Sequence, residues 1–326
     1  MQEVYPDIFM ITEQGAMGAL MPPVNIYVLA GSDGLVFDTG YGRKKILAHL
    51  EKELIRIRDT VHGRGGDFNL TRSLPSHSHP DHISGLRFLR DRFDIDVMLT
   101  ERMTANMNPE QYYRKRGDAY QGYDIGLRKK SLLTFYLKYL QPVMLGTTFP
   151  GTVDHVIPEQ TTLTINNEPW EVMPAPGHCD DHIFLYNAAK GILFSGDNIL
   201  RTITTWLGPP RSDLSAYRRT LEQTLALPRL ELILSAHGSP ITEPRQRIAE
   251  ILAHRDARTR NVLETVQGAG NSGITIKDIT NTLYQGQNAA KRNFADGWII
   301  LTLEALVDQG TVNVEKNRFF YNPSMS

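Results

Sequence analysis

Residues 76–82, with the sequence Ser-His-Ser-His-Pro-Asp-His, constrain this chain more than any other stretch. Three of its ten histidines fall within six residues there, together with a carboxylate. Neutral imidazoles and carboxylates are ligands that first-row divalent metals prefer. Residues two apart at a strand end point the same way, so His77 and His79 can bind one ion. Asp81 and His82 follow where the chain turns and can face a second ion. The alternative is a histidine-rich surface turn, and suitable ligands further along the chain count against it.

The motif and several later residues match a known pattern. The spacing His-x-His-x-Asp-His resembles the signature of the metallo-β-lactamase superfamily, and His178, Asp197 and His237 match its later members. Asp38, in the run Phe-Asp-Thr-Gly, resembles the Asp-x-Gly turn that this family carries early in the fold. The resemblance covers residues 4–244 and implies an α/β protein with the four-layered αββα metallo-β-lactamase fold.

The resemblance also implies two metal sites. Their ligands would be His77, His79 and His178 for the first ion and Asp81, His82 and His237 for the second, with Asp197 bridging both. Two such ions lie ~3.5–4 Å apart, hold a hydroxide between them and polarise the bond under attack. The nucleophile would then be this hydroxide, with Asp81 as the candidate residue to orient it. Zinc is the first expectation for both divalent ions, with iron and manganese as alternatives.

Residues beside the expected ligands are assigned supporting roles. Asp38 suits a turn or helix-cap position and also the support of a ligand from behind, and the two roles are compatible. His182 comes four residues after His178 and is expected to support the site because the ligand set is already complete. Asp180 and Asp181 are interpreted as turn residues. Cys179 adjoins a ligand, but a small buried residue is the favoured interpretation over a metal ligand.

Hydrophobic patterning predicts alternating strands and helices, which is typical of a layered α/β architecture. Apolar runs at 25–30 and 35–38 flank the turn sequence Gly-Ser-Asp-Gly, which predicts a hairpin. Helical spacing predicts a helix over 43–59, and a strand over 68–74 leads into the histidine motif. Further strands are expected at 95–99, 153–157, 161–165, 170–173, 183–186, 191–194 and 230–235, with helices from 83 and over 214–225. Each expected ligand therefore follows a strand end, where sites are commonly built.

Residues 101–152 interrupt this alternation within an expected catalytic domain of residues 1–244. The segment carries eight Lys or Arg residues against four acids and is rich in tyrosine. One interpretation is a helical insertion whose aromatic side chains pack inward. The other is a lid over the metal site whose basic residues attract an anionic substrate. The candidate substrate-binding residues are Tyr112, Tyr113, Arg114, Tyr120 and Tyr123.

Residues 245–326 have a different composition. One or two helices are expected over 248–266, and single helices over 276–283 and 294–308. A hairpin within 312–321 follows, and this succession looks like a winged-helix module. The helix from 294 would be the recognition helix, yet it carries three acids and no basic residue. Phosphate binding needs clustered Lys and Arg, so the pattern favours packing or homodimer formation over nucleic-acid binding.

Bulk composition supports an enzyme of the cytoplasm. The net charge of −1 gives no argument for nucleic acid or a membrane as partner, and no apolar run approaches the roughly 20 residues that span a bilayer. A single cysteine fits a reducing compartment, and the first residues do not resemble a signal peptide.

The expected function is metal-dependent hydrolysis of a small ester, thioester or lactone, anionic substrates included. The first alternative is a phosphodiesterase or ribonuclease, for which the basic insertion is the only local support. A mononuclear iron oxidoreductase of the same superfamily is the second, although a flavodiiron oxidoreductase would have a glutamate where His79 stands. The third is a regulatory protein that binds metal without catalysis. Metal analysis and a substrate panel would separate these classes.

Overall fold

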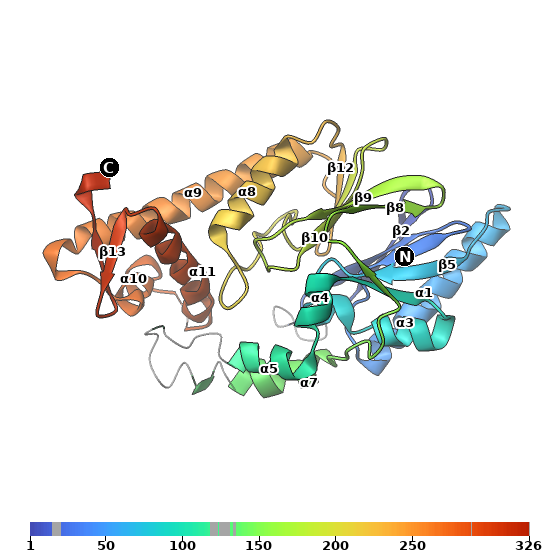
Figure 1. Cartoon of the computed structure of the whole chain (residues 1–326), viewed down its shortest axis with the longest axis horizontal. Helices are drawn as coiled ribbons and strands as arrows, with labels where there is room; N and C mark the ends of the chain where they lie inside the picture. The colour runs from blue at the N-terminus through green and yellow to red at the C-terminus, as the bar shows by residue number, and fades with distance from the viewer. Residues whose placement is uncertain (15–20, 118–122, 124–130, 133–134, 288, 326) are drawn as a thin grey trace.

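The computed structural model describes residues 1–14, 21–117, 123, 131–132, 135–287 and 289–325. Two mixed β-sheets pack against each other at its centre, and helices cover their outer faces (Figure 1). This α/β arrangement gives the four layers that the sequence predicts. Among the described helices, none has the length and apolar character needed to cross a membrane.

The first sheet has seven strands, which lie side by side in chain order. They are β1 (Gln2–Tyr5), β2 (Ile8–Glu13), β3 (Val24–Leu29), β4 (Gly34–Phe37), β5 (Leu70–Leu74), β6 (Asp96–Thr100) and β7 (His155–Ile157). The strands are antiparallel from β1 to β4 and parallel from β4 to β7. The sequence patterns did not predict β1 and β2.

The second sheet has five strands, which lie side by side in the reverse of their chain order. Its order is β12 (Leu232–Ser235), β11 (Ile192–Gly196), β10 (Ile183–Asn187), β9 (Glu168–Pro174) and β8 (Thr161–Ile165). Only the β11–β12 pair is parallel among the described pairs of this sheet.

Strands β2 and β3 are buried on both faces, and their alternating side chains join two different cores. Ile8 and Tyr27 point into the core between the sheets, where Tyr27 lies edge-on to Phe194 of β11 at 5.1 Å. Phe9 and Val28 point the other way, into the core beneath the outer helices. Because side chains alternate along a strand, β2 and β3 pack against the second sheet on one face and against the outer helices on the other.

Helices complete the outer layers. The first sheet is covered by α1 (Lys44–Gly63) and α3 (Leu86–Phe93), which follows the short α2 (Pro80–Ile83). The second sheet packs against α8 (Leu214–Leu225) and α9 (Pro244–Gly268), with Ile248 and Ile251 of α9 in the shared core. The one or two helices expected over 248–266 thus form a single helix, which begins at Pro244.

The segment after β6 is mostly helical up to residue 145 where it is described. It contains α4 (Glu101–Asn106), α5 (Pro109–Gly117), the π-helix η2 (Tyr136–Leu140) and α7 (Gln141–Leu145). Helix α7 packs against α2. The insertion thus lies next to the turn that carries Asp81 and His82, and its action as a lid stays a prediction.

The chain ends with η3 (Gly270–Ser272), α10 (Ile276–Leu283), α11 (Ala289–Asp308), β13 (Val312–Glu315), β14 (Arg318–Tyr321) and η4 (Pro323–Met325). The hydroxyl of Thr275 caps α10, as the sequence suggests, and Gly310 takes a φ of 72° just after α11. Helix α11 starts five residues earlier than expected, so it includes Lys291 and Arg292. The winged-helix assignment and the boundary near residue 244 stay predictions.

Candidate metal centre

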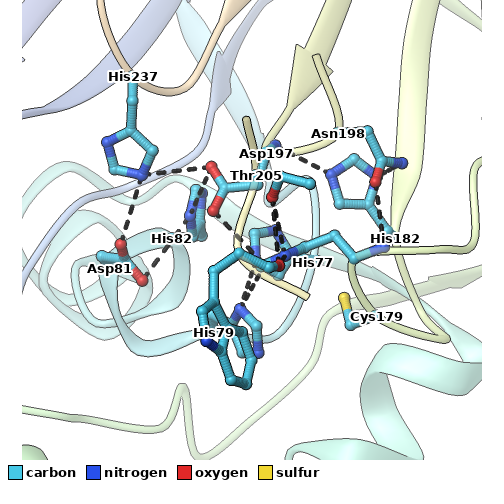
Figure 2. Close-up of polar contacts among 12 residues, drawn as sticks. His77, His79, Asp81, His82, Cys179, His182, Asp197, Asn198, Thr205 and His237 are labelled. Atoms are coloured by element: carbon cyan, nitrogen blue, oxygen red, sulfur yellow. Dashed lines mark hydrogen bonds and ion pairs between the residues drawn. The ribbon is translucent and has the colours of Figure 1, made fainter. Parts of the chain in front are cut away.

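Four loops at the ends of strands bring the expected ligands together (Figure 2). His77 and His79 follow β5, and α2 then presents Asp81 and His82 in its single turn. The remaining three ligands follow β9, β11 and β12, and they are His178, Asp197 and His237. Residues far apart in the chain thus meet because their strands end at the same edge of the two-sheet core.

Three imidazoles form the first group. His77 Nε2 lies 2.8 Å from His79 Nδ1, and His178 Nε2 lies 2.9 Å from the same atom. Burial and the neighbouring imidazole of His82 lower the pKa of His77 well below its ordinary value. Burial also lowers the pKa of His178. Neutral imidazoles whose nitrogens converge in this way are the ligand set that zinc and similar ions bind.

Asp81, His82 and His237 form the second group, in which two histidines face carboxylates. Asp81 lies 3.7 Å from His82 Nε2 through one oxygen and 3.7 Å from His237 Nε2 through the other. Burial opposes the charged form of both histidines. The carboxylates around them nevertheless raise the pKa of His82 to about 10 and that of His237 to about 9. The second group therefore favours positive charge, which a divalent cation would provide in place of protons.

Asp197 lies between the two groups. Its Oδ2 is 3.5 Å from His178 Nε2 in the first group. Its Oδ1 is 3.2 Å from His237 Nε2 and 3.7 Å from His82 Nε2 in the second. Burial favours the neutral acid, but His237, His82 and His178 hold the pKa of Asp197 well below its ordinary value. A carboxylate at this position can bind both ions.

Acceptors behind three of the histidines set which ring nitrogen faces the centre. The Nδ1 atoms of His82, His178 and His237 lie against Asp38 Oδ2 at 3.0 Å, Trp206 O at 2.8 Å and Pro23 O at 2.6 Å, respectively. Because a carboxylate or carbonyl only accepts, each Nδ1 donates and leaves the Nε2 lone pair of the neutral ring turned inward. His82 Nε2 is buried and has no hydrogen-bond partner among the described residues. These residues therefore fit a metal ion.

Asp38 supports the histidine motif directly. It follows β4 in the left-handed region, with a φ of 62°. Its carboxylate accepts from the Ser76 backbone N–H at 2.7 Å and the Ser76 hydroxyl at 3.1 Å, and it also contacts His82. The turn role and the ligand-supporting role that the sequence allows are thus combined in one side chain.

We expect Asp38→Asn to weaken metal binding at His82 by roughly 10–100-fold, because the carboxylate orients the ring and raises its basicity. Asparagine tolerates the same left-handed backbone, so the variant changes mainly the charge. Chelator competition with the metal-free protein measures the affinity. Asp33→Asn, in the preceding hairpin, is the matched control, since Asp33 pairs with Arg72 instead of a histidine. Equal affinities for wild type and Asp38→Asn would contradict this role.

His182 lies beneath the ligand loop. Its Nε2 accepts the Asp197 backbone N–H at 3.1 Å, and its Nδ1 is 3.3 Å from the amide of Asn198. Burial, with the neighbouring His178, lowers the pKa of His182 to about 3, so the ring is neutral. A Cβ at Gly196 would lie 2.5 Å from His182 Nε2, so the turn before Asp197 needs glycine to close over this ring. His182 therefore positions a ligand loop.

Arg211 holds two ligand loops together, and sequence patterns did not reveal it. Its guanidinium binds Asp180 at 2.6 Å, Asp181 at 2.5 Å and the Ser78 hydroxyl at 2.7 Å. Ser78 lies between His77 and His79, whereas the two aspartates follow His178. Arg211 thus joins the first histidine pair to the third histidine. Asp180 and Asp181 thus support the loop that carries His178 through their contacts with Arg211.

Cys179 faces the same network. Its thiol donates to Asp181 Oδ1 at 3.1 Å, and the side chain is fully buried. Burial raises the pKa of the thiol well above its ordinary value, so it is neutral. These contacts agree with the expected role of a small buried residue.

The predicted substrate residues of the insertion are dispersed. The ring of Tyr112 is buried edge-on to Phe149 at 5.3 Å, and Arg114 is exposed on α5. The hydroxyl of Tyr123 donates to Glu304 of α11 at 2.5 Å, in the C-terminal region. Tyr120 and the side chain of Tyr113 lie outside the described residues. The described tyrosines are thus engaged in packing contacts, and their substrate role stays a prediction.

Comparisons with known proteins agree with this architecture. An atrochrysone carboxyl ACP thioesterase from Aspergillus novofumigatus is 23% identical over 317 residues, which cover 94% of this chain and 78% of that protein. A beta-lactamase-like protein 2 homolog from Caenorhabditis elegans is 28% identical over 158 residues, about half of each protein. The crystal structure of a metallo-beta-lactamase family protein from Thermus thermophilus superposes with a TM-score of 0.74 at 21% identity, covering 98% of this chain and 100% of that one.

The family model of the metallo-beta-lactamase superfamily matches residues 21–237, which include both ligand groups and Asp197. The match covers more than half of the chain, and the fold and the His/Asp clusters agree with it. The chain therefore belongs to the metallo-beta-lactamase superfamily.

Proposed function

We propose that this protein is a metal-dependent hydrolase that cleaves acyl thioesters. The observation that carries the proposal is the convergence of two ligand groups on one shared carboxylate, Asp197. Two bound divalent ions would supply an activated water molecule and a polarised carbonyl. Superfamily membership makes hydrolysis the expected reaction type, whereas the choice of a thioester rests on two further observations.

The residues around the centre have two further roles, which are to orient the imidazoles and to orient the attacking water. Carbonyl and carboxylate acceptors hold the imidazoles in one tautomer, which keeps the centre preorganised before substrate arrives. Asp81 is the most exposed of the three carboxylates nearest His82, with 18% of its side chain accessible against 1% for Asp38 and 12% for Asp197. An accessible carboxylate beside the centre can orient the attacking water and accept its proton.

Exposed apolar side chains within residues 203–206, the segment whose backbone carbonyl contacts His178, are the first observation in favour of an acyl substrate. Trp206, whose carbonyl binds His178 Nδ1, is 41% exposed, and Ile203 is 58% exposed. Exposed apolar surface that is contiguous commonly marks a binding site, and these two side chains would contact an acyl chain beside the ligands. The second observation is that a protein named as an ACP thioesterase is similar over 94% of this chain.

A substrate panel tests the proposal. The metal-loaded protein is assayed with acyl-pantetheine thioesters of increasing chain length, an aryl ester, a lactone, a β-lactam and a phosphodiester. We expect the highest kcat/KM for thioesters and an increase with acyl length, since each buried methylene contributes at most about 0.8 kcal/mol. Chelator-treated protein is the control. Turnover of the phosphodiester alone would contradict the proposal and favour the phosphodiesterase alternative.

A further inference from the structure

Helix α9 binds the backbone of the segment that follows Asp197. Arg247 donates from Nε to the Leu200 carbonyl at 2.7 Å and from Nη2 to the Ile203 carbonyl at 3.0 Å. Arg255, about two turns further along α9, donates from Nη2 to the Thr205 carbonyl at 2.6 Å. Two arginines of one helix therefore hold three carbonyls of residues 200–205.

The same segment orients a metal ligand. The Trp206 carbonyl accepts from His178 Nδ1 at 2.8 Å, and the Thr205 hydroxyl lies 3.1 Å from the same nitrogen. A shift of the segment would turn the imidazole and move its Nε2 away from His79 and Asp197. The position of His178 Nε2 thus depends on where α9 holds the backbone of Thr205.

A second path leads from Arg255 to the ligand loops. Its guanidinium lies over the ring of Tyr217 at 5.5 Å, and the Tyr217 hydroxyl donates to the Asn198 carbonyl at 2.8 Å. Asn198 follows Asp197, and its side-chain oxygen accepts the His178 backbone N–H at 3.2 Å. Arg255 is therefore connected to both the imidazole and the backbone N–H of His178.

The burial of Arg255 is costly for the fold. The residue is 3% exposed, and no Asp or Glu in the described part of the chain forms an ion pair with it. Its Nε also has no hydrogen-bond partner there. Burial lowers the pKa of Arg255 to about 10. A buried charge without a carboxylate partner destabilises a protein, so a methionine of similar length would suit the fold at least as well. Stability therefore does not explain the arginine.

We propose that Arg255, assisted by Arg247, is a positioning residue through which helix α9 sets the metal affinity of the centre. The arginines hold residues 200–205, and these residues hold the imidazole of His178 in its binding orientation. This role rests on the metal-binding part of the proposed function and is independent of the substrate.

The test uses the full chain and measures metal binding apart from catalysis. Metal-free wild type, Arg255→Met and Arg255→Lys are titrated with Zn²⁺ against a chelator, and the visible spectrum is recorded with Co²⁺. We expect Arg255→Met to weaken metal affinity by roughly 10–100-fold and to change the Co²⁺ spectrum. The urea midpoint of the metal-free protein should stay equal or rise. Lysine restores one donor and should recover part of the affinity.

Two further variants make the result specific. Arg258 lies on the same helix, and its guanidinium packs over the ring of Trp298 at 4.6 Å. Arg258→Met should therefore leave the metal affinity and the Co²⁺ spectrum unchanged. Arg247→Met removes the other carbonyl contacts and should give a smaller loss than Arg255→Met. Wild-type affinity in both Arg255 variants would overturn the positioning role, as would a parallel fall of affinity and metal-free stability. A wild type that binds no metal would instead overturn the proposed function.

Discussion

Replacing Asp197 by asparagine is expected to lower kcat/KM by roughly a thousandfold or more and to release metal, because metal-based catalysis contributes several kcal/mol. The Asp197 carboxylate lies 3.2–3.7 Å from the Nε2 atoms of three histidines. His178 belongs to the first ligand group, and His82 and His237 belong to the second. Asparagine keeps the size of the side chain and removes the charge. Both ions would therefore lose a ligand in one substitution.

Metal content and turnover of Asp197→Asn are measured on the same preparation. Asp91→Asn, on the exposed face of α3, is the control, because Asp91 pairs only with surface arginines among the described residues. It should match the wild type in both quantities. An Asp197→Asn protein with full metal content and wild-type turnover would show that Asp197 does not bridge the two groups.

Arg211→Met is expected to lower the free energy of unfolding by about 3–5 kcal/mol at pH 7, since removing one partner leaves a buried charge uncompensated. Asp181 is fully buried, and its carboxylate pairs with Arg211 at 2.5 Å. Urea denaturation of the metal-free proteins measures the difference. Arg87→Met removes an exposed pair with Asp91 and should cost less than about 1 kcal/mol. Equal losses in the two variants would contradict the structural role of Arg211.

The pH dependence of this difference has a defined sign. Burial opposes ionisation of Asp181, but Arg211 holds its pKa below the ordinary value of 3.8. The ionised pair therefore stabilises the wild type fully above that value, and the stability is lost as the pH falls below it. Without Arg211, burial raises the pKa of Asp181 above 3.8. Between these two values the folded variant binds a proton that the unfolded chain does not, so the variant gains stability as the pH falls from 7 towards 4. The difference in the free energy of unfolding between wild type and Arg211→Met should be smaller at pH 4 than at pH 7. A difference that does not change with pH would argue against this ion pair.

The residues that converge at the candidate centre could be predicted from sequence because metal chemistry limits the residue types and their loops follow recognisable strands. His77, His79, Asp81 and His82 are close in the chain, and three distant residues completed the pattern. The acceptors behind the ligands could not be predicted in the same way. The carbonyls of Pro23 and Trp206 belong to the backbone, so no residue type indicates them. Arg211 lies in a loop without a motif and acts only through tertiary packing.

The insertion shows a second limit of sequence patterns. Its tyrosines suggested a substrate surface, yet Tyr112 packs inward and Tyr123 contacts Glu304 of the C-terminal region. An aromatic residue in a helix serves a core or a binding surface equally well, and only the fold decides which. Likewise, β1 carries polar residues at an edge of the sheet, where alternation is a weak signal.

Metal stoichiometry of the purified full-length chain tests the central claim most directly. The protein is reconstituted with Zn²⁺, separated from free metal by gel filtration and measured by inductively coupled plasma mass spectrometry. The ligand groups around Asp197 predict two ions per folded chain. A folded protein that retains one ion or none under these conditions would contradict the two-ion centre.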